Sequence, residues 1–199
     1  YNKSMKNQPP LAIKKIEPQR SELVILLELF QSKQYYEAEK LALVLTDKFK
    51  THPFGWKVLG AVFNKTGRLS EGLIACQKSV ELDPENAENH NNLANIFHKL
   101  DRLKEAEKSY KKVVELTPEN AEIYNSLGNI FNKSGKFYEA EKSYIKALTL
   151  NPNFAIAHNN LGVVLKKLGK KQGAEKSYKL AISLMPNFTN ALINKGQLL

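Results

Sequence analysis

Four prolines recur at a constant interval along this 199-residue chain, each 34 residues from the next: Pro84, Pro118, Pro152 and Pro186. The segments before them share sequence as well as length. Residues 90–118 read HNNLANIFHKLDRLKEAEKSYKKVVELTP, and residues 124–152 read YNSLGNIFNKSGKFYEAEKSYIKALTLNP. A fixed interval of this size indicates a repeat architecture, in which each unit packs on its neighbours and no single large core is needed.

Each unit carries two amphipathic helical patterns. In the first half, apolar positions recur at i, i+3, i+4 and i+7, as in Tyr124, Leu127, Gly128 and Phe131, and this spacing places them on one face of an α-helix. The second half has the same kind of pattern, and the proline at its end terminates the helix. Short turns are predicted between the two halves, at Gly67, Asp101, Gly135 and Gly169. The sequence therefore predicts stacked helical hairpins.

Small and bulky residues alternate in a way that predicts how the hairpins pack. Small residues of the first helices are expected to oppose small residues of the second helices, so that the helix axes approach closely: Gly60, Ala94, Gly128 and Gly162 against Gly72, Ala106, Ala140 and Ala174. His90 and His158 occupy the bulky position held elsewhere by Trp56 and Tyr124, and we expect them to be buried. Cys76 occupies the aromatic position of Tyr110, which predicts an inert buried thiol.

The register gives the domain organisation. Residues 1–20 form a polar, proline-containing leader, and residues 21–199 form the array. Within the array we predict a degenerate repeat, four full repeats and a partial repeat: 19–52, 53–86, 87–120, 121–154, 155–188 and 189–199. In the degenerate repeat, helices are expected over 21–32 and 35–49, with Ser21 as the N-cap. Because the partial repeat lacks a covering helix, we expect either further chain beyond it or self-association through this C-terminal helix.

The positions of the recurring residues resemble a known family. Trp56, Leu59, Gly60, Phe63, Gly72, Cys76 and Pro84 follow, with mild substitutions, the tetratricopeptide pattern W-x2-L-G-x2-Y, A-x3-F and P. The resemblance covers most of the chain. It implies an all-α fold, a right-handed superhelical solenoid of antiparallel helical hairpins whose first helices line a concave groove. It also implies an interaction scaffold that binds a partner protein or an extended peptide in that groove.

The first-helix residues outside the predicted core are the candidate groove residues. Asparagine dominates them, and its two donors and one acceptor suit the amides of an extended peptide backbone. The candidate residues are Lys57, Asn64, Asn91, Asn92, Asn95, His98, Asn125, Asn129, Asn132, Asn159, Asn160, Lys166 and Asn194.

Two other interpretations of the asparagines remain open. Asn92, Asn160 and Asn194 are similar to the asparagine ladder of O-linked N-acetylglucosamine transferases, whereas Val58 and Ser126 depart from it. That resemblance implies an alternative function, the substrate-recruiting arm of a larger protein glycosyltransferase with its catalytic domain outside this segment. Equally, the asparagines can satisfy polar groups between adjacent hairpins without any ligand. A carboxylate clamp for chaperone C-termini is disfavoured, because its cation positions are not filled.

Charge and motif content limit the other function classes. The formal net charge is +10, and residues 155–199 carry seven lysines and one glutamate. No aromatic residues that would stack on bases lie among Lys166, Lys167, Lys170 and Lys171, so an acidic partner, an acidic neighbouring domain or a plain contribution to solubility is favoured over nucleic acid. Without metal-ligand spacing, a P-loop or a nucleophile motif, the sequence predicts a non-catalytic segment with no cofactor and no metal. No apolar run has membrane-spanning length, and with no secretory signal and a single cysteine we predict a cytoplasmic location.

Overall fold

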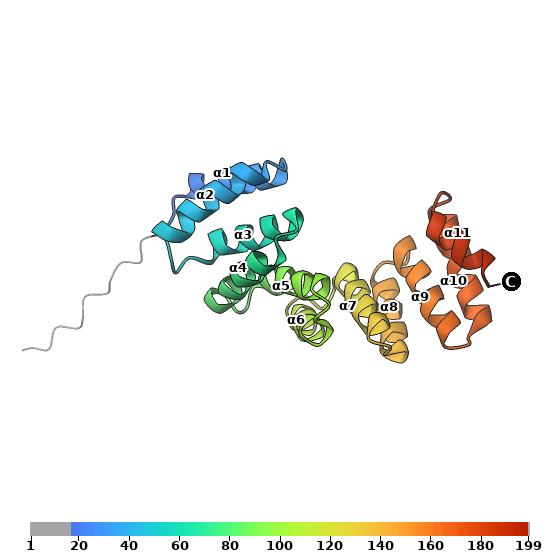
Figure 1. The fold of residues 1–199 in the computed structure, drawn as a ribbon. Helices are drawn as coiled ribbons and strands as arrows, with labels where there is room; N and C mark the ends of the chain where they lie inside the picture. The colour runs from blue at the N-terminus through green and yellow to red at the C-terminus, as the bar shows by residue number, and fades with distance from the viewer. Residues whose placement is uncertain (1–16, 199) are drawn as a thin grey trace, which may run out of the picture.

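The computed structural model describes residues 17–198, and this part of the chain forms eleven α-helices arranged as consecutive hairpins (Figure 1). They are α1 (Arg20–Gln31), α2 (Tyr35–Lys48), α3 (Pro53–Thr66), α4 (Leu69–Leu82), α5 (Ala87–Lys99), α6 (Leu103–Leu116), α7 (Ala121–Lys133), α8 (Phe137–Leu150), α9 (Ala155–Lys167), α10 (Lys171–Leu184) and α11 (Thr189–Gly196). The predicted all-α solenoid is confirmed. The predicted leader falls mainly on residues 1–16, which lie outside the described residues.

The start of α1 differs from the prediction that Ser21 is its N-cap. Arg20 already belongs to the helix, and Gln19 is the capping residue. The Glu22 carboxylate accepts a hydrogen bond of 2.8 Å from the backbone N–H of Gln19. A carboxylate at the third helical position that reaches back in this way satisfies a donor left free at the helix start, so Ser21 is displaced into the first turn.

The predicted turns lie where each hairpin reverses. Gly67, Gly135 and Gly169 have φ of 80°, 73° and 74°, and Asp101 has φ of 58°. This left-handed conformation is unstrained for glycine and tolerable for aspartate. The degenerate first hairpin uses Lys33, with φ of 62°, at the same register position, which shows that the backbone geometry persists where the sequence pattern has decayed.

The helices form an inner and an outer layer. The odd-numbered helices contact one another as well as their partners, in the series α1–α3–α5 and α7–α9–α11. No two even-numbered helices pack closely within residues 17–198. The odd-numbered helices therefore lie on the inner side of the curve, and the even-numbered helices spread apart on the outer side.

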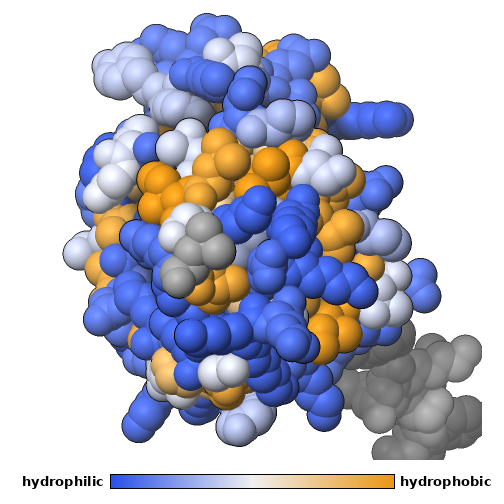
Figure 2. Space-filling model, turned by 90° about the vertical axis from the view of Figure 1, so that its right-hand side faces the viewer, coloured by the Kyte–Doolittle hydropathy of each residue, from blue (hydrophilic) through white to orange (hydrophobic). Residues whose placement is uncertain are grey.

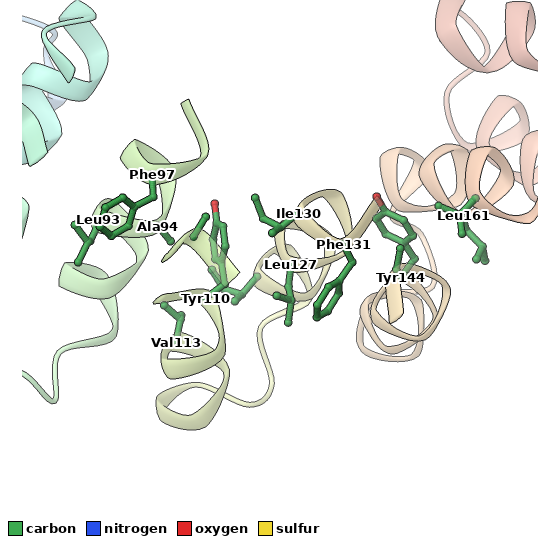
Figure 3. Packing of buried hydrophobic residues seen from close by; sticks show 14 of the residues in the cluster. Leu93, Ala94, Phe97, Tyr110, Val113, Leu127, Ile130, Phe131, Tyr144 and Leu161 are labelled. Atoms are coloured by element: carbon green, nitrogen blue, oxygen red, sulfur yellow. The ribbon is translucent and has the colours of Figure 1, made fainter. Parts of the chain in front are cut away.

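A continuous core joins the repeats from α4 to α10. Tyr110 and Tyr144 contribute the second-helix aromatic side chains, and both are fully buried between one hairpin and the next (Figure 3). Removing a large apolar side chain from water contributes about 1.5–3 kcal/mol. Stability is thus distributed along the array, and each hairpin depends on its neighbour.

The glycines of the first helices accommodate bulky side chains, which corrects the predicted small-against-small contact. A Cβ at Gly128 would lie 2.6 Å from the Tyr144 ring, and one at Gly162 would lie 2.5 Å from the Tyr178 ring. Gly60 faces Cys76 in the same way. The aromatic ring of the second helix, 16 residues later, needs the space that the missing Cβ leaves.

Ion pairs join successive repeats on the outer side. Three pairs share one register: Glu39 with Arg68, Glu107 with Lys136, and Glu141 with Lys170, each at 2.7 Å. Exposed pairs of this kind contribute at most about 1 kcal/mol each. They fix the orientation of adjacent hairpins more than they add to stability.

The histidines at the bulky first-helix position are not buried, contrary to the prediction. His90 and His158 are half-exposed, and their Nε2–H groups donate to the carbonyl oxygens of Pro84 and Pro152, at 2.7 and 2.9 Å. An imidazole gains a hydrogen bond here because the helix-ending proline leaves an unpaired carbonyl within reach. The Cys76 prediction is confirmed: the side chain is fully buried, and burial raises the pKa of its thiol to about 12.

Candidate partner-binding site

The candidate asparagines lie mainly on the inner helices α5, α7, α9 and α11. Their equivalent positions repeat every 34 residues, so the stacking of the hairpins brings side chains from successive helices together. The asparagines fall into two groups. Some have side chains that form hydrogen bonds within the array, and others keep donors or acceptors without a partner in the described residues.

Two of the candidates are buried. Asn125 and Asn159 are only 8% and 6% exposed. The Asn160 amide donates to the Asn125 oxygen at 3.1 Å, and the Asn194 amide donates to the Asn159 oxygen at 2.9 Å. These contacts cross from one hairpin to the next. They match the interpretation in which asparagines satisfy one another between hairpins, and they leave Asn125 and Asn159 beneath the surface of the site.

Asn95 and Asn129 are held by tyrosine hydroxyls. The Tyr110 hydroxyl donates to Asn95 Oδ1 at 2.6 Å, and the Tyr144 hydroxyl donates to Asn129 Oδ1 at 2.7 Å. Burial raises the pKa of both tyrosines, so the hydroxyls stay protonated and act as donors. Sequence reasoning missed these partners, although the constant separation of 15 residues was a signal for them.

The edge of the site carries lysines that bridge consecutive inner helices. Lys99 Nζ donates to the backbone oxygen of Asn64 at 2.7 Å, and Lys167 Nζ donates to Asn132 Oδ1 at 2.8 Å. The Asn64 side-chain oxygen is shielded from solvent and has no partner within residues 17–198. Lys166 donates to a backbone oxygen of the segment after α11 at 3.0 Å. Lys166, a predicted groove residue, therefore contacts the following repeat, and Lys99 and Lys167, which were not predicted groove residues, contact the preceding one.

The remaining candidates differ in whether their side chains already bond other residues of the chain. Lys57 forms an ion pair of 2.7 Å with Glu88 of the next inner helix. Asn91 and Asn92 are half-exposed, and their side chains make no hydrogen bond with other described residues. At the ladder positions, Asn160 and Asn194 are thus engaged within the array, and Asn92 is not.

His98 is the only histidine in the candidate set. Burial and the nearby Lys133 ammonium lower the pKa of the imidazole, and the Asp101 carboxylate opposes this shift. The folded chain therefore disfavours the protonated ring. Between its lowered pKa and the ordinary value of about 6.5, the unfolded chain binds a proton that the folded chain does not.

This linkage predicts that stability falls as the pH decreases below about 6.5. In urea unfolding followed by circular dichroism, the decrease between about pH 7.5 and 5.5 should be smaller for His98→Gln than for the parent chain. An equal decrease in both proteins would show that other groups cause the pH dependence.

The C-terminal basic cluster is partly neutralised in the folded chain. Lys170 pairs with Glu141 at 2.7 Å, whereas Lys171, Lys176 and Lys195 form no ion pair within the described residues. Figure 2 looks onto this end of the molecule and shows hydrophobic side chains among hydrophilic ones. Leu192 and Ile193 of α11 are about half exposed. The self-association predicted for this helix stays a prediction.

No group of three or more His, Cys, Asp or Glu side chains in residues 17–198 is placed to hold a metal ion. None of the helices described for this range is both long and apolar enough to cross a membrane.

Comparison with known proteins gives family matches along the array. Models of the tetratricopeptide repeat match residues 75–108 and 155–188, and a model described as a TPR repeat matches residues 95–135 and 128–169. Together they span residues 75–188, more than half of the chain. A sequence search of curated proteins found no significant match.

Solved structures with the same fold cover most of the chain. YrrB, described as a TPR protein with an unusual peptide-binding site, is 19% identical with a TM-score of 0.79, and the match covers 89% of this chain and 91% of YrrB. MamA is 20% identical with a TM-score of 0.76, covering 80% and 94%. PilF of Pseudomonas aeruginosa is 19% identical with a TM-score of 0.79, covering 89% and 81%. With its registered repeats and matching hairpin geometry, the chain belongs to the tetratricopeptide repeat family.

Proposed function

We propose that this protein is an interaction scaffold that binds an extended segment of a partner protein along the inner face of its odd-numbered helices. The inner helices pack on one another while the outer ones spread apart, so this face is concave. The peptide-binding site described for YrrB, which shares the fold, supports the same use of such an array.

The observation that carries the proposal is the orientation of two half-exposed amides. Tyrosine hydroxyls donate hydrogen bonds to the side-chain oxygens of Asn95 and Asn129. The Nδ2 groups of both residues donate to no other described residue. Each amide therefore presents its two N–H donors while its acceptor is held by the core.

Because the side-chain N–H donors of Asn95 and Asn129 have no acceptor within the array, they favour a ligand that is rich in hydrogen-bond acceptors. An extended peptide offers a backbone carbonyl at every residue, and these groups form hydrogen bonds with side-chain amides regardless of sequence. Lys99 and Lys167, at the ends of α5 and α9, add positive charge along one edge, whereas Lys133 of α7 is paired with Asp101 at 2.7 Å. The expected partner segment is therefore extended, with carbonyl and carboxylate groups facing the array.

Substitution by aspartate tests the donors without disturbing the tyrosine contacts. Asn95→Asp and Asn129→Asp keep an oxygen for each hydroxyl but remove the amide N–H groups. A peptide selected on the parent chain from a random phage-displayed library would be labelled and measured by fluorescence anisotropy. We expect the double variant to bind it at least about tenfold more weakly, because two hydrogen bonds are lost and a charge faces the carbonyls.

The matched control is Asn151→Asp, at the exposed end of α8, which should leave binding unchanged. Circular dichroism should show the same helix content in all variants. Unchanged affinity in the double variant, with the fold intact, would contradict the proposed role of the inner face.

A further inference from the structure

The outer surface contains clefts that the inner-face proposal does not use. Because the even-numbered helices spread apart, cavities open between successive pairs of them, with an inner helix as the floor. Three such cavities occur at equivalent positions: about 660 Å³ between α2 and α4, about 770 Å³ between α4 and α6, and about 480 Å³ between α6 and α8.

The cavity between α6 and α8, here called the convex cleft, combines an apolar floor with basic walls. Tyr124, Leu127 and Phe131 of α7 form the floor, and Lys111 of α6 with Lys142 and Lys146 of α8 line the sides. Leu127 and Phe131 are largely buried, while Tyr124 is half-exposed. Lys146 Nζ lies 5.9 Å from the centre of the Tyr124 ring.

The convex cleft differs from the preceding cavity, the one between α4 and α6, in the pairing of one lysine: Lys146, whose equivalent in the preceding cavity is Lys112. Lys112 lies between Glu85 and Glu115, at 3.3 and 3.9 Å. One repeat later, Thr149 stands in the position of Glu115, and its hydroxyl donates to the backbone oxygen of Ile145. No ion pair forms at Lys146 or at Lys142 within residues 17–198.

This difference determines what the convex cleft can recognise. Unpaired ammonium groups at the rim attract carboxylates. The apolar floor contributes to binding only when an apolar side chain covers it and removes it from water. A cavity of a few hundred Å³ has room for such side chains. A polyphosphate backbone would leave the floor uncovered and would meet the Glu139 carboxylate, which lines the same cavity.

We propose that the convex cleft binds an acidic amphipathic segment of a partner protein. Its apolar side chains cover Tyr124, Leu127 and Phe131, and its carboxylates pair with Lys142 and Lys146. This surface is separate from the inner face, so the array can hold two partner segments, or two parts of one partner, on opposite sides.

The test uses a synthetic probe and the full chain. The probe is a fluorescein-labelled peptide of about 14 residues with leucines at helical spacing and glutamates between them; a version with lysine in place of glutamate and an oligo(dT) strand serve for comparison. In anisotropy titrations at moderate salt, the acidic probe should bind and the basic one should not. Lys142→Gln with Lys146→Gln should raise the Kd of the acidic probe about fivefold.

A second double variant, Lys65→Gln with Lys171→Gln, removes the same charge from exposed positions outside the cleft and should change the Kd less than twofold. Circular dichroism checks that both variants keep the helix content of the parent. An equal loss of affinity for the acidic probe in the two double variants would show that only the net charge matters, and it would contradict a specific role of the cleft. Failure of the acidic probe to bind, or oligo(dT) binding that depends on Lys142 and Lys146, would overturn the proposal. None of these outcomes affects the inner-face test, which depends on Asn95 and Asn129.

Discussion

Replacing Tyr144 by alanine should lower the free energy of unfolding by about 3–5 kcal/mol. The side chain is fully buried between α7 and the next hairpin, and its ring fills the space left by the missing Cβ of Gly128. The substitution opens a cavity at the contact between two repeats. It also removes the hydroxyl that holds Asn129. Chemical unfolding followed by far-ultraviolet circular dichroism gives the change.

Two further variants separate the causes. Tyr144→Phe keeps the ring and removes only the hydroxyl; because Asn129 still accepts from Asn160 at 3.1 Å, the expected loss is about 1 kcal/mol. Tyr138→Ala, at a 71% exposed position on the same helix, should cost no more than about 0.5 kcal/mol. If Tyr144→Ala lowered the free energy of unfolding no more than Tyr138→Ala, the packing of Tyr144 would not be what holds the two repeats together.

Replacing Asn160 by alanine should cost about 1–3 kcal/mol more than replacing Asn92, its equivalent two repeats earlier. The Asn160 amide donates to Asn125 and Asn129 at 3.1 Å, and its oxygen accepts from Asn159 at 3.3 Å. Its loss leaves polar atoms of the buried Asn125 and Asn159 without partners. Asn92 bonds no other described residue. Both substitutions change helix propensity equally, so this contribution cancels in the comparison.

The same unfolding experiment measures both variants. Equal stability losses would show that the asparagine network contributes nothing to the joint between α7 and α9, and that the ladder positions are equivalent. A large difference would identify Asn160 as a joint residue and leave Asn92 as the ladder asparagine that is available to a partner.

A comparison of equivalent residues in different repeats shows how far the sequence could predict the site. Position within the repeat placed the candidate asparagines correctly on the odd-numbered helices. It could not separate Asn92 from Asn160, because the difference depends on the neighbouring repeat: Asn160 faces Asn125 and Asn129, whereas Asn92 follows a repeat without asparagines at those positions. The histidine prediction failed for the same reason. The carbonyls of Pro84 and Pro152 belong to the preceding hairpin.

The sequence by itself determined the hairpins and their stacking. The 34-residue period, the apolar spacing and the glycine turns are local properties, and each repeat reinforces the same register. Only the tertiary structure decided which polar groups are left unpaired. Tyrosines 15 residues further along the chain hold the oxygens of Asn95 and Asn129 and leave their donors free, and Lys142 and Lys146 form no ion pair within the described residues. Hydrogen bonds and ion pairs depend on distances of a few ångströms between neighbouring hairpins, and a periodic pattern specifies the hairpins but not those distances.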